Sequence, residues 1–162
     1  MRKSIIAILM TFCLSIMTYA QTPRDRATEL KEQAQSSLNQ KDYIKARYLF
    51  KKAYEAFVTR ENYPQAIECG VQANALYVRE NFYKEGFELC RDMDQLIWAG
   101  EQNQKKVFYD LRFLVNKERL QMYTALKNPA QAKTQLNKLE ETANLAKNDS
   151  LTEVLLYTKA NY

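Results

Sequence analysis

Three six-residue stretches, KDYIKA at 41–46, ENYPQA at 61–66 and NFYKEG at 81–86, decide the fold of this 162-residue chain. They recur at a constant interval, each with Tyr at its third position and a small residue, Ala or Gly, at its sixth. An interval of about 20 residues per helix, or about 40 per helix pair, is typical of stacked helical hairpins. The small residue would let a neighbouring backbone approach, and we expect the Tyr ring to fill the corner where the chain reverses.

The remainder of the chain also favours helix, because it contains only three Gly and three Pro and is rich in Lys, Glu, Gln, Ala and Leu. Breaker residues predict seven helices: 25–39, 42–60, 64–80, 82–99, 104–126, 129–148, and a short one opened by a capping box from Ser150 to Glu153. Gly100 is expected to end the fourth helix, and Pro64 and Pro129 to begin the third and the sixth. The predicted fold is an all-α, right-handed α-solenoid of stacked antiparallel helix hairpins.

The first hairpin carries a pattern of small, aromatic and Ala residues at spacings of four and three, namely Ala46, Phe50 and Ala53, with Ala34 twelve residues upstream. This pattern resembles the tetratricopeptide repeat (TPR) superfamily, and the resemblance covers about residues 25–148. Later units depart from it, and their equivalent positions are Gly86, Cys90 and Met93, then Ala132, Leu136 and Leu139. The helix pairs are also longer than the usual repeat of about 34 residues. The resemblance implies a TPR-like array of hairpins.

The first twenty residues predict export. Arg2 and Lys3 precede an apolar run over 5–17, and small residues stand at positions 18 and 20. These features are typical of a secretory signal peptide cleaved after Ala20. The alternative, a membrane anchor, needs about 20 apolar residues, more than this run has. We therefore expect residues 21–162 to form one helical-repeat domain that is exported to a periplasm and has no stable membrane span.

The composition removes most catalytic classes. The chain has no His, and its three glycines lie too far apart for a phosphate-binding loop. Paired carboxylates occur only on expected helices beside Lys or Arg, where solvated faces are the better interpretation. Cleavage would lower the formal net charge of +5 by two, which is too weak a bias to indicate nucleic acid. The chain is predicted not to be an enzyme and to need no cofactor or metal.

The fifth helix carries the candidate binding surface. At 100° per residue, one polar stripe rich in Arg and Tyr falls within an arc of about 80° between apolar shoulders. Its members are Lys105, Tyr109, Arg112, Asn116, Arg119 and Tyr123. One helix of each hairpin lines the concave face of such an array, and Arg and Tyr commonly anchor partners, so this stripe predicts a peptide-binding groove. The alternative interpretation is that the two tyrosines pack against neighbouring helices while the arginines cover their rings.

The third helix is expected to be the inner helix of the second pair, with Gln65, Gln72 and Tyr77 as weaker candidates. Cys69 and Cys90 fall on neighbouring antiparallel helices, where a disulfide is possible, although two small buried side chains are the preferred interpretation.

Two functions follow from this organisation. The first is an exported, non-catalytic scaffold that binds a protein or peptide segment. The second is the N-terminal sensor part of a longer, membrane-spanning signal-transduction regulator, since the short last helix either caps the array or is followed by further repeats.

Overall fold

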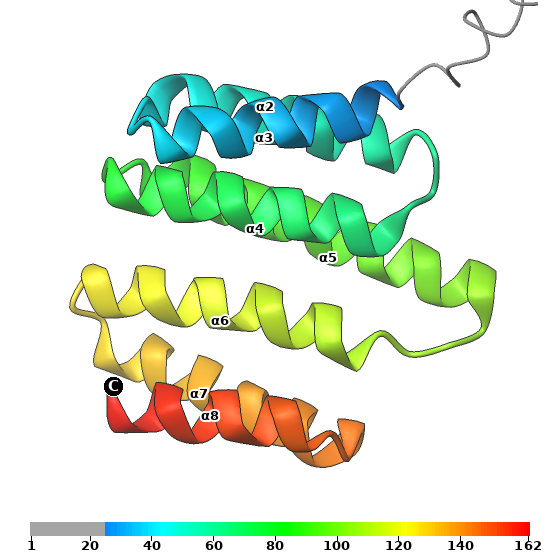
Figure 1. Ribbon diagram of the computed structural model, residues 1–162. Helices are drawn as coiled ribbons and strands as arrows, with labels where there is room; N and C mark the ends of the chain where they lie inside the picture. The colour runs from blue at the N-terminus through cyan, green and yellow to red at the C-terminus, as the bar shows by residue number, and fades with distance from the viewer. Residues whose placement is uncertain (1–24) are drawn as a thin grey trace, which may run out of the picture.

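The computed structural model describes residues 25–162, which form seven helices and contain no strand. The helices are α2 (Arg26–Asn39), α3 (Tyr43–Val58), α4 (Tyr63–Arg79), α5 (Tyr83–Gln104), α6 (Tyr109–Ala125), α7 (Pro129–Ala146) and α8 (Asp149–Ala160) (Figure 1). The all-α prediction is confirmed. The predicted signal peptide, 1–20, lies outside the described residues.

Consecutive helices run antiparallel and pack against one another along the whole described chain (Figure 1). Figure 1 shows them in successive layers, with α2 and α3 at one end of the array and α7 and α8 at the other. Helix α4 also contacts α6, so the first helices of two neighbouring pairs lie side by side. This is the solenoid-like arrangement that the regular spacing of the three stretches indicated, and its right-handed sense stays a prediction.

The regular spacing originates in the turns. Lys41, Glu61 and Asn81, which hold the same place in three successive turns, all adopt a positive φ of 55–63°. This left-handed conformation ends a helix by turning the chain away from its axis. In each case the next residue is the N-cap, and the recurring Tyr is the first residue of the following helix. The repeated motif is therefore a helix–turn–helix connection, made by local interactions.

The small residues of the repeated motif are buried as expected. Ala46 and Ala66 are 0% exposed, and Gly86 is buried as well. A Cβ atom at Gly86 would lie 2.8 Å from Sδ of Met122 and 3.0 Å from Oδ1 of Asn74. At this position the small residue makes room for neighbouring side chains, whereas we had expected a neighbouring backbone.

Three predicted helix boundaries are wrong: the end of the fourth helix, the start of the fifth and the start of the last. Helix α5 continues through Gly100 to Gln104, because Gly100 is buried against the rings of Tyr63 and Phe108 and this packing offsets its low helix propensity. The chain then turns at Lys105, which has a φ of 50°, so the next helix begins at Tyr109 and not near residue 104.

The last helix begins at Asp149, one residue before the predicted capping box. Its N-cap is Asn148, whose side-chain oxygen accepts a hydrogen bond from the backbone N–H of Ser150 at 3.0 Å. Asn is as favourable at the N-cap as Ser, so the helix can begin after Asn148 and does not need Ser150 as its cap.

The buried apolar residues form two clusters that share α6. The larger cluster spans α2 to α5 and includes one side of α6, with Leu111, Val115 and Met122. The smaller cluster joins the other side of α6 to α7 and α8 and consists of Phe113, Leu120, Ala132, Leu139, Ala143 and Leu155. Helix α6 thus lies between the two clusters and contributes buried residues to both.

Cys69 and Cys90 belong to the larger cluster and are free. Burial raises the pKa of each thiol to about 12. The preferred interpretation, two small buried side chains, is confirmed.

One buried polar pair joins α4 to α6. The Glu118 carboxylate, 4% exposed, accepts a hydrogen bond from Nδ2 of Asn74 at 3.0 Å. Oδ1 of the same Asn74 amide has no hydrogen-bond partner within residues 25–162. Burial raises the pKa of Glu118, and the hydrogen bond from Asn74 opposes this in part. The hydrogen-bond partner of this buried carboxylate is therefore a neutral amide.

Glu118 should make the protein less stable as pH rises. Its raised pKa means that the folded state favours the neutral carboxyl, so the folded state holds a proton that the unfolded state releases above about 4.5. Stability is then lost as pH rises from that value through the raised pKa. Glu118→Gln should abolish this slope and raise the free energy of unfolding at pH 8 by roughly 1–3 kcal/mol, the cost of a poorly compensated buried polar group.

Urea unfolding between pH 5 and pH 8 measures this effect. Glu85→Gln, an exposed substitution on α5, is the matched control and should leave the slope unchanged. A Glu118→Gln variant as pH-sensitive as the parent protein would refute the prediction.

Candidate functional site

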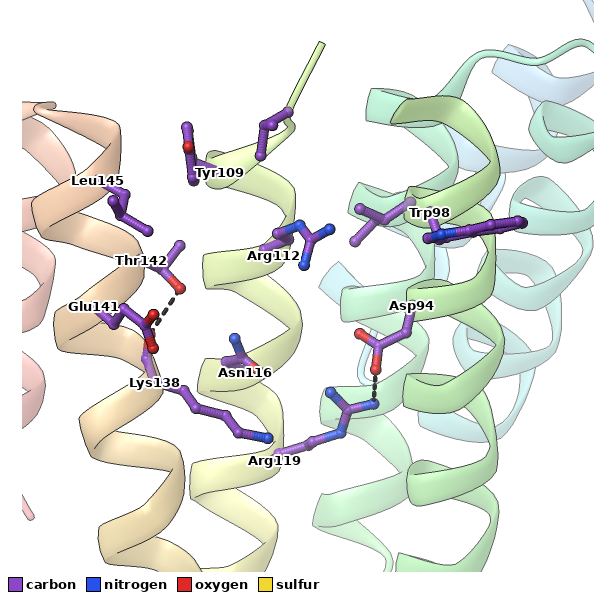
Figure 2. A pocket seen from close by; sticks show the side chains of 12 residues that line it. Asp94, Trp98, Tyr109, Arg112, Asn116, Arg119, Lys138, Glu141, Thr142 and Leu145 are labelled. Carbon is purple, nitrogen blue, oxygen red and sulfur yellow. Dashed lines mark hydrogen bonds and ion pairs between the residues drawn. The ribbon is translucent and has the colours of Figure 1, made fainter. Parts of the chain in front are cut away.

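A groove runs along α6 between α5 and α7 (Figure 2). It encloses a cavity of about 550 Å³, for which α6 forms the floor and the other two helices form the walls. The lining residues are Asp94, Ile97 and Trp98 of α5, Val107 of the following turn, Tyr109, Arg112, Asn116 and Arg119 of α6, and Lys138, Glu141, Thr142 and Leu145 of α7.

Large apolar side chains stand exposed around this groove. Trp98 is 62% exposed, Val107 45% and Leu145 54%, and each comes from a different segment. Val107 and Tyr109 also line a second cavity of about 450 Å³, with Pro64 and Leu111 among its other walls. Exposed apolar side chains that converge on one hollow are typical of a protein-interaction site.

Arg112 is held in the groove by Glu101, at the C-terminal end of α5. Its Nε donates to Oε1 of Glu101 at 2.7 Å and its Nη2 donates to Oε2. Glu101 is 8% exposed and also accepts a hydrogen bond from the backbone N–H of Phe108 at 2.8 Å. The hydrogen bonds from Arg112 lower the pKa of Glu101, so the pair is charged at neutral pH. It ties the α5–α6 turn to both helices.

Arg119 is also anchored to α5. Its Nη2 donates to the backbone carbonyl of Cys90 at 3.0 Å and to Oδ2 of Asp94 at 2.6 Å. Only 15% of its side chain is exposed, against 49% for Asp94. Figure 2 shows Asp94 pointing down from α5 onto the guanidinium. Both groove arginines thus take part in α5–α6 packing while facing the cavity.

The structure gathers four of the nine predicted residues into the groove: Tyr109, Arg112, Asn116 and Arg119. Lys105 does not belong to the stripe, because it is the left-handed residue that ends α5 and precedes the turn. Tyr123 lies further along α6, where its ring packs on Phe87 with the centroids 4.8 Å apart. For Tyr123, packing against a neighbour is therefore the correct interpretation.

The three candidates on α4 lie outside the groove, and Gln65 accepts a hydrogen bond from Nζ of Lys31 at 2.9 Å. The Tyr77 ring is covered by the guanidinium of Arg47, 4.9 Å from its centroid, and Arg47 forms an ion pair with Glu80. Gln72 is exposed on α4 and does not line this cavity. The candidates on α4 and the polar stripe of α6 therefore do not line the same cavity. The polar stripe of α6 faces the second helices, α5 and α7, whereas α4 contacts α6 elsewhere, at Asn74 and Glu118.

Sequence reasoning missed both walls of the groove. The missed residues are Asp94, Ile97, Trp98, Val107, Lys138, Glu141, Thr142 and Leu145. A signal was present for two of them, because Trp98 and Leu145 are large apolar residues that fall on otherwise polar helix faces. Their convergence on α6 depends on tertiary packing.

Within residues 25–162, no three or more Cys, Asp or Glu side chains gather into a group that could hold a metal ion. In the same part of the chain, no helix has the length and apolar character to cross a membrane. Comparisons of the chain with family models, with curated proteins and with solved structures found no match.

Proposed function

We propose that this protein is an exported, non-catalytic, TPR-like scaffold that binds a segment of another protein in the groove between α5 and α7. The observation that carries the proposal is the convergence of Trp98, Val107 and Leu145, all well exposed, on one cavity of about 550 Å³. Trp is prominent among the residues that dominate binding energy at interfaces. Export is supported by residues 1–20 alone, and the TPR-like character by the pattern at Ala34, Ala46, Phe50 and Ala53.

Anchored polar groups make the groove suited to binding. Glu101 fixes Arg112, and Asp94 fixes Arg119, so little side-chain freedom remains to be lost when a partner binds. The walls come from helices and not from long loops, which keeps the cavity preformed. These features support a preformed binding surface.

The test compares proteins captured by the parent chain and by two matched double variants. Trp98→Ala with Leu145→Ala removes the exposed apolar side chains of the groove. Ile44→Ala with Tyr48→Ala removes apolar side chains of similar exposure, 70% and 61%, from α3, away from the groove. We expect at least one protein, measured by quantitative mass spectrometry, to be retained by the parent and the α3 variant and lost by the groove variant by about tenfold or more.

Charge reversal at Arg112 or Arg119 is a poorer test, because it would leave Glu101 or Asp94 facing a second carboxylate and destabilise the α5–α6 packing. The proposal fails if both double variants, with unchanged circular dichroism spectra, retain the same proteins as the parent.

A further inference from the structure

Several hydrogen-bond donors of the groove have no acceptor among the described residues. Arg119 donates through Nη2 to Asp94 and to the Cys90 carbonyl, and its Nε and Nη1 have no partner among the described residues. Arg112 donates through Nε and Nη2 to Glu101, and its Nη1 has no partner among the described residues. Both guanidiniums are held in place by these bonds, so the remaining N–H groups have fixed directions.

Two further donors lie at the Arg119 end of the groove. Lys138 and Asn116 line the cavity and make no side-chain hydrogen bond or ion pair within residues 25–162. Figure 2 shows the Lys138 side chain extending from α7 past Asn116 toward Arg119. A lysine that approaches an arginine is unfavourable unless an anion lies between or beside them. Asp94 is the acceptor at this end and is engaged by Arg119, so the side chains of Lys138 and Asn116 are left without an acceptor within residues 25–162.

We infer that the groove recognises a carboxylate side chain, an Asp or Glu of the bound segment, at the place where Lys138, Asn116 and Arg119 meet. An apolar residue of the same segment then packs against Trp98, which stands on the opposite wall. This inference rests on the proposed function and specifies the chemistry of its partner.

A monoanion fits the charges better than a phosphate does. The positive charges of Arg112 and Arg119 are already balanced by Glu101 and Asp94, so Lys138 contributes the one cation lining the groove without an ion-pair partner in residues 25–162. Glu141, on α7 one turn from Lys138, adds a negative charge to the same wall and disfavours a dianion further. With Glu141 counted, three carboxylates face the three cations, so a monoanion is accommodated at lower electrostatic cost than a dianion.

The experiment uses the full chain and a random 12-residue peptide library displayed on phage. The most enriched peptide is synthesised in acid, amide and phosphoserine forms at its acidic position, and each dissociation constant is measured by fluorescence anisotropy. We expect the amide form to bind about five- to tenfold more weakly than the acid form, and Lys138→Met to remove most of that difference. Lys133→Met, an exposed substitution on the same helix outside the groove, is the matched control and should not change it.

A charge swap provides the decisive comparison. Lys138→Glu should weaken binding of the acid form of the peptide, and a peptide with Lys at the acidic position should bind this variant again. Enriched peptides without a preferred acidic position, an amide form that binds as well as the acid, or a phosphoserine form that binds tenfold more tightly would each overturn the inference. In those outcomes the groove still binds peptides and the proposed function stands. If no peptide depends on Trp98, the proposed function fails together with the inference.

Discussion

Phe113→Ala is expected to unfold the C-terminal part of the array while the first helices stay folded. Phe113 is fully buried and is the largest side chain of the smaller core, where it packs with residues of α7 and α8. Truncating a buried Phe to Ala typically costs about 3–5 kcal/mol, a large share of the roughly 5–15 kcal/mol that stabilises a whole domain. The smaller core has only six buried members, so little remains to hold α7 and α8.

Hydrogen exchange measured by mass spectrometry can locate this effect. We expect peptides from α7 and α8 to lose protection in Phe113→Ala, while peptides from α2 and α3 retain it, because helical arrays are stabilised mainly between nearest neighbours. Phe50→Ala, the equivalent truncation in the larger core, should show the reverse pattern. Identical losses of protection in the two variants would mean that the two clusters unfold as one cooperative unit.

Gly100→Ala is expected to destabilise the protein although it places Ala inside a helix. In an unconstrained helix this change would gain about 1 kcal/mol. Here the new Cβ atom would lie 2.8 Å from Cε2 of Phe108 and 3.0 Å from Cγ of Tyr63. Both atoms belong to rigid rings, and the Tyr63 hydroxyl is held by a hydrogen bond from Nδ2 of Asn103 at 3.1 Å. Such overpacking costs about 1–3 kcal/mol and should outweigh the gain in helix propensity.

Thermal unfolding provides the measurement, and the melting temperature of Gly100→Ala should fall by a few degrees. Gln102→Ala is the control, since this exposed residue lies on the same helix two positions away and should shift the melting temperature little. An increase in the melting temperature of Gly100→Ala would show that the Tyr63 and Phe108 rings can move aside. If the rings stay in place, the turn that contains Val107 and Phe108 should shift as well.

The polar stripe shows how far a helix pattern can predict a site. A period of 100° per residue correctly put Tyr109, Arg112, Asn116 and Arg119 on one face. It could not exclude Lys105, because helix α5 continues through the buried Gly100 and ends only at the left-handed Lys105. Nor could it show that acidic residues of α5 hold both arginines, since Asp94 and Glu101 are distant in sequence from their partners.

The sequence by itself determined that the described chain is helical and turns at a regular interval in its first half. Those features arise within single turns, where a left-handed residue, an N-cap and a Tyr follow one another at 41–43, 61–63 and 81–83. Only the tertiary structure decided which helices flank the polar stripe of α6. Helix α6 has buried apolar residues on two sides, one facing each core, so its amphipathic pattern was compatible with more than one placement. The packing of α5 and α7 on either side of it selected one of them and thereby formed the groove.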